Sequence, residues 1–313
     1  MTRDRDGPAR RRQSWFGLKK PVKDLASYPL PHAGLRLAAR ISPKLRSGRL
    51  PAPRNVREVR GSVLGSSYFM LRPDRCEIAK ELYWGAGRRP RPEDAFAIEL
   101  VGRLASEAGT FFDIGAYTGV FTLVTTVTNP GLTAHAFEIV PAVADLLEAN
   151  AHRNGVEARV VVHRIGVGVS GATMVVPIGE GGSALPSFYS SKMRFDEGVS
   201  VAFTSLDDLI ELVADERGVV IKIDVEGTEA AIFEHGSAFL ARHKPDILCE
   251  LLFGQAQPEV VTRVLDPLGY DAYLVSEGQL LRRDAIAPDR RFRDWLFTSR
   301  TPSDLRRLQV LSD

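Results

Sequence analysis

Cysteine is scarce in this 313-residue chain, which contains only Cys76 and Cys249. The two lie far apart and lack the close spacing of a metal site. Cys249 falls inside the apolar run 247–252 and is expected to be a buried thiol. Such sparing use of cysteine is typical of a reducing compartment, so we expect a cytoplasmic location.

Long apolar runs are also missing. No stretch reaches the roughly 18 residues that a membrane-spanning helix needs. Arginine and lysine interrupt the N-terminus where a signal peptide would carry its apolar core. Hydrophobic residues make up 44% of the chain and charged residues 26%, which is ordinary for a globular protein with one substantial core. We therefore expect no transmembrane segment.

Charge is distributed unevenly along the chain. Residues 1–60 contain 16 Lys and Arg against 4 Asp and Glu, a balance of +12, whereas the remaining 253 residues sum to −10. This basic head is rich in Pro and Gly, as solvated tails are. Residues 35–41 (LRLAARI) have the pattern of a short amphipathic helix that suits an anionic membrane surface or a partner protein. The acidic remainder, with no interleaved basic and aromatic stretch, argues against nucleic acid as a partner.

The chain is organised around the stretch 110–138 (TFFDIGAYTGVFTLVTTVTNPGLTAHAFE). It reads as a buried strand, a glycine turn, a helix from about 118 to 128, and a second strand over 132–137. Small residues in the turn let the backbone bend sharply and approach a ligand. The second strand places Glu138 at its C-terminal end, the edge of an open α/β sheet where ligands bind.

A nucleoside with free ribose hydroxyls fits this arrangement, because the Glu138 carboxylate can accept hydrogen bonds from both hydroxyls. Two cofactor classes come into question, a dinucleotide and S-adenosylmethionine. The spacing Gly115-x-x-x-Gly119 lacks the middle glycine of the dinucleotide fingerprint. The negative charge of Asp113 would also repel a pyrophosphate, whereas it suits the cationic amino-acid tail of S-adenosylmethionine. The predicted cofactor is S-adenosyl-L-methionine, with predicted contacts at Asp113, Gly115, Ala116, Tyr117, Gly119 and Glu138.

A family resemblance rests on three segments: 113–116 (DIGA), Glu138 with Pro141 after it, and 222–229 (KIDVEGTE). Together they resemble the FkbM family of S-adenosylmethionine-dependent methyltransferases over roughly 63–300. The resemblance implies a Rossmann-like, seven-stranded class I methyltransferase sheet and O-methylation of small molecules or sugars. Two positions depart from the family pattern: Tyr117 stands where Asn is usual, and Ile139 where Pro often follows the ribose-binding acid.

Strands alternate with helices along the remainder, as in a doubly wound α/β fold with helices on both faces of a mainly parallel sheet. No internal repeat interrupts this order. Four parts are expected: a basic N-terminal extension over 1–60, a cap segment over 61–109, the methyltransferase core over 110–300 and a tail over 301–313. The oligomeric state cannot be read from these patterns.

Carboxylates gather at 224–229 (DVEGTE), after the fourth core strand. Because the first and fourth strands are neighbours in this fold, Asp224 and Glu226 should lie beside the turn at 113–119. Clustered carboxylates repel one another, which raises the pKa of one and suits it to act as a general base. We predict Asp224 and Glu226 as the catalytic residues, whereas Glu229 fits better as a charge at a helix N-terminus.

The same residues are compatible with other chemistry. The same acids could hold a divalent cation, although no metal ligands are assigned. His163 and His235 are alternative bases, each of a kind that is more often structural. Lys222 is expected to neutralise a neighbouring acid. Glu250 either reaches the acceptor pocket or is a paired core acid.

The leading function is O-methylation of a hydroxyl on a small molecule, sugar or natural product. A second is methylation of a lipid-linked or carrier-bound substrate that docks through residues 1–60. A nucleic-acid methyltransferase or a non-catalytic nucleotide-binding protein fits the composition less well. A nicotinamide-dependent reductase is disfavoured by the glycine spacing.

Overall fold

The computed structural model describes residues 28, 34, 50–177, 198–213, 217–225 and 227–311. It divides into two compact units: Met1–Arg60 with Met70–Pro90, and Gly61–Phe69 with Arg91–Asp313. Most of the basic head lies outside the described residues, so its docking role stays a prediction. No helix in the described part of the chain is both long and apolar enough to cross a membrane.

The first unit contains one described α-helix, α3 (Glu77–Trp84). Cys76 caps this helix, since its Sγ accepts a hydrogen bond from the backbone N–H of Ala79 at 3.3 Å. At the other end, the Trp84 indole N–H donates to the Leu50 carbonyl oxygen at 3.1 Å. The boundary between the units passes through β1 (Glu58–Val63) and β2 (Ser66–Leu71), which form a two-stranded sheet.

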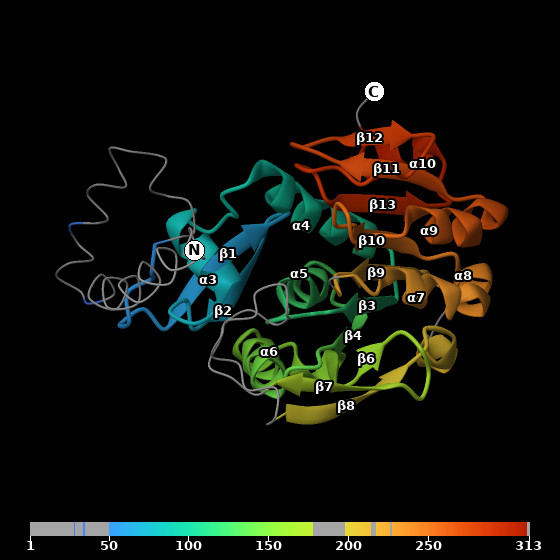
Figure 1. Cartoon of the computed structure of the whole chain (residues 1–313). Helices are drawn as coiled ribbons and strands as arrows, with labels where there is room; N and C mark the ends of the chain where they lie inside the picture. The colour runs from blue at the N-terminus through green and yellow to red at the C-terminus, as the bar shows by residue number, and fades with distance from the viewer. Residues whose placement is uncertain are drawn as a thin grey trace, which may run out of the picture. The chain divides into compact units, whose positions relative to one another are not determined.

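The second unit is built on an eight-stranded sheet of order β12-β11-β13-β10-β9-β3-β4-β5 (Figure 1). Its strands are β3 (Thr110–Ile114), β4 (Thr133–Phe137), β5 (Val160–His163), β9 (Val219–Ile223), β10 (Asp246–Glu250), β11 (Asp271–Val275), β12 (Leu280–Arg283) and β13 (Asp294–Thr298). The five strands from β5 to β10 are parallel, and β13 runs antiparallel to β10. The chain winds outward from β3 in one direction and from β9 in the other, so the strand order reverses between them. That reversal is where open α/β sheets bind ligands.

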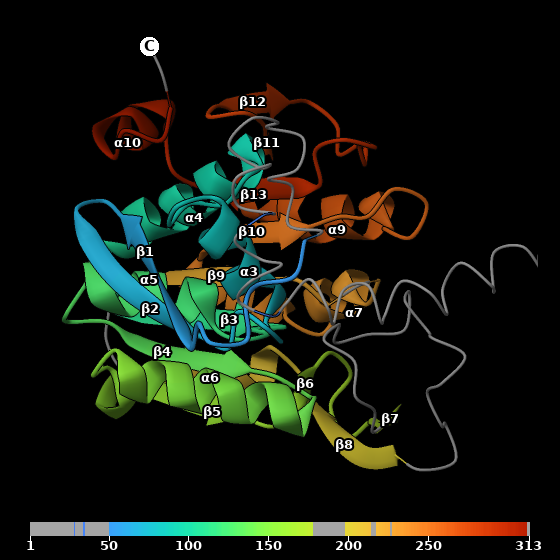
Figure 2. The same cartoon turned by 90° about the vertical axis from the view of Figure 1, so that its left-hand side faces the viewer.

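Helices cover both faces of this sheet, as the alternation of buried side chains requires. Phe111 and its neighbours pack with α4 (Pro92–Ala105) and α10 (Pro302–Arg307), whereas Phe112 points to the other face with α7 (Glu229–Glu234), α8 (Ser237–His243) and α9 (Pro258–Leu265). Figure 2 shows the face of the sheet that Phe111 lies on, where α4, α5 (Val120–Thr128) and α6 (Pro141–Arg153) lie side by side. The expected α/β class with two helical layers is therefore confirmed.

The expected strand count of seven is wrong, because β12 adds an eighth strand. It pairs with β11 through a tight turn in which the Ser276 N–H donates to the Gln279 carbonyl at 3.0 Å and Gly278 has a φ of +79°. The strand was hard to foresee, since its sequence LLRR buries only Leu280 and carries no alternating pattern. Gly278 was the available signal, as glycine marks short hairpin turns.

Two further features lie beyond the central sheet. After β5 the chain forms β6 (Gly166–Val167), which joins β7 (Thr173–Pro177) and β8 (Gly198–Thr204) in a small sheet of order β6-β8-β7. The helical stretch that follows β9 is interrupted at Gly236, between α7 and α8, where an added β-carbon would crowd the Ile232 carbonyl oxygen and the Leu206 side chain. Short 3-10 helices complete the fold at Glu157–Arg159, Asp207–Leu212 and Asp266–Leu268.

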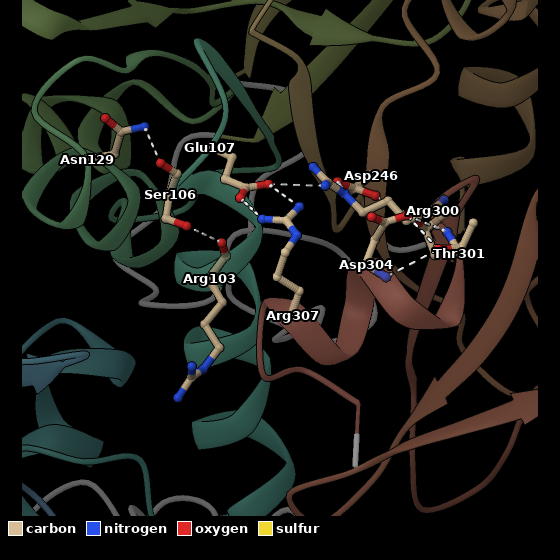
Figure 3. Close-up of polar contacts among 10 residues, drawn as sticks. Arg103, Ser106, Glu107, Asn129, Asp246, Arg300, Thr301, Asp304 and Arg307 are labelled. Carbon is tan, nitrogen blue, oxygen red and sulfur yellow. Dashed lines mark hydrogen bonds and ion pairs between the residues drawn. The ribbon is translucent and has the colours of Figure 1, made fainter. Parts of the chain in front are cut away.

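A network of hydrogen bonds and ion pairs lies at the N-terminal ends of the parallel strands, away from the candidate site (Figure 3). Asp246, at the start of β10, accepts hydrogen bonds from the Thr298 hydroxyl at 2.5 Å and from Arg300 Nε at 2.7 Å. Glu107 binds both Arg300 and Arg307, which attaches α10 to the segment that leads into β3. Asp246, which is buried and paired with Arg300, serves structure rather than catalysis, because it lies at the opposite end of the strand from the ligand-binding edge.

Candidate functional site

The turn between β3 and α5 forms the centre of the candidate site. Gly115 and Gly119 have φ values of +77° and +83°, a conformation that glycine adopts without steric cost. A β-carbon added to Gly115 would collide with the backbone carbonyl of Asp224, and one added to Gly119 would lie 2.8 Å from Leu147 Cγ. The Gly115 and Ala116 N–H groups both donate to the Phe137 carbonyl at 3.0 Å. The turn is thus held against the ends of β4 and β9.

Asp113 lies beneath this turn and binds the start of α5. Its Oδ2 accepts hydrogen bonds from the Thr122 backbone N–H at 3.0 Å and from the Thr122 hydroxyl at 2.6 Å. Gly119, the N-cap residue, has no side chain to cap the helix, so Asp113 performs that task from the preceding strand. Burial raises the pKa of Asp113 to about 6, against the opposing effect of the Thr122 hydrogen bonds. Its predicted contact with the cofactor stays a prediction.

Glu138 follows β4 directly, as the sequence predicts, and is 4% exposed. Its Oε2 accepts from the Tyr117 N–H at 2.9 Å and its Oε1 from the Val140 N–H at 2.8 Å. Burial raises the pKa of this carboxyl to about 7, although the backbone hydrogen bonds oppose that shift. Each carboxylate oxygen carries two lone pairs, so one remains on each for a further donor. These two acceptor positions fit the paired hydroxyls of a ribose, which would donate to them.

Tyr117 occupies an unusual backbone position. Its φ of +49° lies in the left-handed region, which a bulky residue rarely adopts and which Asn tolerates better. The Asn that is usual in the resembling family is therefore explained by the backbone at this position. The Tyr117 N–H still reaches Glu138, so the departure leaves that hydrogen bond intact.

Charged side chains from three strand ends meet beside this turn. Asp224 follows β9, and its N–H donates to the Ile114 carbonyl at 2.9 Å, which confirms that it lies next to the glycine turn. Lys222 Nζ lies 3.5 Å from both Asp224 Oδ2 and Asp294 Oδ1. Glu250, at the end of β10, lies opposite Asp294 in the β10–β13 pair, and its Oε1 is 3.1 Å from Arg293 Nη1.

These contacts set the ionisation of the cluster. Burial lowers the pKa of Lys222, but the carboxylates of Asp224, Asp294 and Glu250 outweigh it and place the pKa above its ordinary value. Lys222 therefore neutralises its neighbours, as expected. Partial burial opposes ionisation of Asp224, yet the charge of Lys222, 3.5 Å away, brings the pKa of Asp224 below its usual value. Burial and the charge of Asp224 raise the pKa of Glu250 to about 8.

The remaining predicted residues have different surroundings. Glu226 lies outside the described residues. Glu229 begins α7, and its Oε1 accepts from the Gly227 N–H at 2.8 Å. His163 Nε2 lies 3.0 Å from His135 Nδ1, and burial lowers the pKa of both rings. His235 ends α7 as its C-cap residue. Within the described ranges, no three His, Cys, Asp or Glu side chains are placed to hold a metal ion together.

Sequence reasoning missed two members of the cluster, Arg293 and Asp294. Asp294 is the first residue of β13, and Arg293 precedes it. They reach the site only because β13 runs antiparallel to β10. The pattern of a buried strand, DWLFT, was visible, but its direction was not. The available signal was Asp294, an acid at the first position of an otherwise buried strand.

Comparison with known proteins gives one family and several distant structural likenesses. The model of the methyltransferase FkbM domain matches residues 113–272, about half of the chain. Comparison with curated protein sequences gives no significant match. Among solved structures, a methyltransferase FkbM from Methylobacillus flagellatus KT has 19% identity and a TM-score of 0.42, covering 61% of this chain and 44% of that one.

Two other structures are similar at the same low level. An O-methyltransferase from Bacillus cereus, in complex with SAH, has 15% identity and a TM-score of 0.38, covering 66% of this chain and 80% of that one. The O-methyltransferase TomG from Streptomyces achromogenes, in complex with SAM, has 10% identity and a TM-score of 0.36, covering 64% and 77%. The family model matches from Asp113 onward and includes the glycine turn, Glu138 and three charged residues near it, Lys222, Asp224 and Glu250. The chain belongs to the FkbM family of S-adenosylmethionine-dependent methyltransferases.

Proposed function

We propose that this protein methylates a hydroxyl group of a small molecule, sugar or natural product. The observation that carries the proposal is the position of Asp224, whose backbone binds the glycine turn and whose side chain is 41% exposed. Lys222 favours the ionised form of this carboxylate. A neutral hydroxyl must lose its proton as it is methylated, and an ionised, accessible carboxylate beside the cofactor turn suits that task.

The surrounding residues are assigned binding roles in this proposal. Glu138 would accept hydrogen bonds from the ribose hydroxyls, while Ala116 and Tyr117 would lie along the nucleoside. Carboxylates outnumber cations at this edge of the sheet, which suits a positively charged ligand. The bound cofactor supplies a methyl group that the adjacent sulfonium has already activated. The protein therefore needs to align the acceptor oxygen and remove its proton.

The test is a search for methyl gain across an acceptor panel. Purified protein and S-adenosylmethionine would be incubated with sugars, hydroxylated aromatics, hydroxy acids and matched amines, and the products examined by mass spectrometry. Gain of one methyl group at a hydroxyl, absent without the cofactor, is the expected result. Methylation confined to the amines would contradict O-methylation while leaving methyl transfer intact.

Asp224→Asn and Glu226→Gln would be run on the same acceptor. At least one should retain cofactor binding while turnover falls on the order of 10²–10⁴-fold, the usual scale for loss of a general base. A metal-dependent reaction would instead respond to chelator and added cation. A base at His163 would leave both amides active and make His163→Ala the inactive variant.

A further inference from the structure

Two turns continue neighbouring strands at the ligand edge of the sheet. One follows β10 and the other precedes β13, and these strands pair antiparallel (Figure 1). Their ladder extends past Glu250, because the Leu251 N–H donates to the Arg293 carbonyl at 2.8 Å. The β10 turn, residues 252–256, and the β13 turn, residues 289–292, therefore start from the two ends of one hydrogen bond.

Local hydrogen bonds fix the shape of both turns. In the β10 turn, the Leu252 carbonyl accepts two backbone N–H groups, at 3.1 and 3.0 Å. In the β13 turn, Asp289 Oδ1 accepts from the N–H groups of Arg291 and Phe292, at 2.6 and 2.9 Å. An aspartate that binds the backbone two residues further on is a common way to define a turn. The side chains that these turns carry therefore start from defined positions.

The β10 turn also contacts the loop that carries the candidate base. A β-carbon added to Gly227 would lie 3.4 Å from Gln255 Oε1, so the two loops touch there. Asp224 lies three residues before Gly227. A ligand that reaches Asp224 with its hydroxyl can thus extend toward the two turns.

Arg290 and Phe253 stack on one another across the two turns. Arg290 Cζ lies 4.5 Å from the centre of the Phe253 ring. Phe253 is nevertheless 54% exposed, although a large apolar side chain gains free energy when it is buried. A guanidinium that stacks face-on on an aromatic ring keeps its N–H donors in its own plane, free for other partners. The stack therefore holds a set of oriented donors at the ligand edge.

Charge pairing distinguishes Arg290 from the arginines that follow it. Arg291 pairs with Glu277, and Arg293 pairs with Glu250 at 3.1 Å. Arg290 has an exposed side chain and no carboxylate partner among the residues that the structure describes. Its charge is therefore available to a ligand, whereas the other two are already compensated.

We propose that Arg290 binds a carboxylate of the methyl acceptor, so that the substrate class is a hydroxylated carboxylic acid. This rests on the proposed function, in which Asp224 faces the acceptor hydroxyl. A guanidinium binds a carboxylate through two parallel hydrogen bonds. One uncompensated guanidinium matches one negative charge, and the nearby acids Glu250 and Asp294 would repel a doubly charged phosphate more strongly. Arg290 thereby determines specificity and takes no part in proton transfer.

The first experiment measures binding without turnover. Full-length protein saturated with S-adenosylhomocysteine would be titrated calorimetrically with uronic acids, hydroxybenzoic acids and hydroxy fatty acids, each beside its neutral methyl ester, and with sugar phosphates. At least one acid should bind more tightly than its ester. Arg290→Ala should weaken that binding roughly 10- to 100-fold, the scale of a lost charged hydrogen-bonding partner. Arg290→Lys should restore only part of it, because an ammonium lacks the planar pair of donors.

The matched control is Arg153→Ala. Arg153 ends α6 and also stacks on an aromatic ring, with its Cζ 4.0 Å from the centre of Phe69. This variant should keep the preference for the acid, and both variants should keep the parent melting temperature because both arginines are exposed. The proposal is overturned if no acid binds more tightly than its ester, if the preference survives in Arg290→Ala, or if sugar phosphates bind more tightly than every carboxylic acid.

The second experiment measures methyl transfer to the same acid and ester pairs. In Arg290→Ala the KM for the acid should rise roughly 10- to 100-fold with kcat little changed, as expected when uniform binding is lost, and the KM for the ester should stay as in the parent. Phe253→Ala should raise the KM for the acid by a smaller factor, because it removes the ring that orients the guanidinium.

Contrary results separate the two proposals. If hydroxyls are methylated but Arg290→Ala leaves the KM for the acid unchanged, the carboxylate site is refuted and the proposed function stands. If acids bind through Arg290 and no hydroxyl gains a methyl group, the proposed function fails, and the carboxylate site stands without its assignment to a methyl acceptor.

Discussion

The backbone carbonyl of Asp224 fills the space that a side chain at Gly115 would need. This one contact joins the cofactor turn to the end of β9, and the Asp224 N–H returns a hydrogen bond to the Ile114 carbonyl at 2.9 Å. The candidate base and the turn are thereby held as one rigid unit. Any change that separates them should affect folding and ligand binding together.

Gly115→Ala tests this contact. The substitution adds a side chain at a φ of +77°, which costs roughly 1–2 kcal/mol for an L-residue, and it also forces β3 and β9 apart. Gly278→Ala is the matched control, because Gly278 has a φ of +79° with open space around it. Urea denaturation should show a clearly larger loss of unfolding free energy for Gly115→Ala. Equal losses of unfolding free energy for the two variants would mean that the contact between Gly115 and Asp224 makes no extra contribution to stability.

Thr122→Val tests the capping of α5 by Asp113. The substitution keeps the shape of the side chain and removes the 2.6 Å hydrogen bond to a buried carboxylate, which should lower the free energy of unfolding by about 1–3 kcal/mol. The control is Thr126→Val, whose hydroxyl donates only to carbonyls of its own helix, at 2.7 and 3.1 Å. Thr126→Val should lose less unfolding free energy in the same denaturation experiment. A larger loss for Thr126→Val than for Thr122→Val would contradict the capping role of Asp113.

Glu138→Ala tests the ribose contact. Loss of charge-assisted hydrogen bonds should weaken S-adenosylmethionine binding by roughly 1–3 kcal/mol. Calorimetry would measure the affinity, with Glu157→Ala as control because Glu157 is an exposed acid in the 3-10 helix before β5. Unchanged affinity in a folded Glu138→Ala protein would rule out the ribose role.

Glu138→Gln tests the pKa of this carboxyl through stability. Burial raises the folded pKa from 4.5 to about 7, so the folded state binds more protons than the unfolded state between these values. The parent's stability from this group is therefore present below about pH 4.5 and is lost as the pH rises toward 7. Glu138→Gln cannot titrate, so thermal unfolding across this range should fall less with pH than in the parent. Parallel curves would show that Glu138 has an ordinary pKa.

The parts of the site that sequence could predict are those encoded within one short segment. Gly115, Gly119 and Glu138 lie within 25 residues, and their order alone indicates a strand, a turn and a second strand with an acid at its end. The structure adds what depends on register between distant strands. Glu250 meets Arg293 and Asp294 only because β13 enters the sheet antiparallel to β10, and no local pattern carries that direction.

Helix and strand ends were missed for a related reason. The interruption at Gly236 follows from packing against Leu206, a residue 30 positions earlier in the chain, rather than from helix propensity. Likewise β12 forms because β11 offers it a partner, although its own sequence is half exposed. Both cases show tertiary contacts overriding weak local preference.

The last prediction concerns where the basic head ends. Composition places the boundary near residue 60, whereas the first unit already uses residues from Leu50 onward. Ala52 is 1% exposed, and the Leu50 carbonyl accepts a hydrogen bond from the Trp84 indole at 3.1 Å. Deleting residues 1–49 should therefore leave the melting temperature and the affinity for S-adenosylhomocysteine unchanged.

Deleting residues 1–55 should behave differently. It removes the buried Ala52 and the acceptor of Trp84, which should lower the melting temperature by several degrees, the effect of roughly 1–2 kcal/mol in a protein of this size. Differential scanning calorimetry and isothermal titration on both truncations would decide. Equal melting temperatures would show that residues 50–55 contribute nothing to the fold. If the shorter deletion already unfolds the protein or abolishes cofactor binding, the head is part of the folded enzyme, and a separate docking role for it would have to be abandoned.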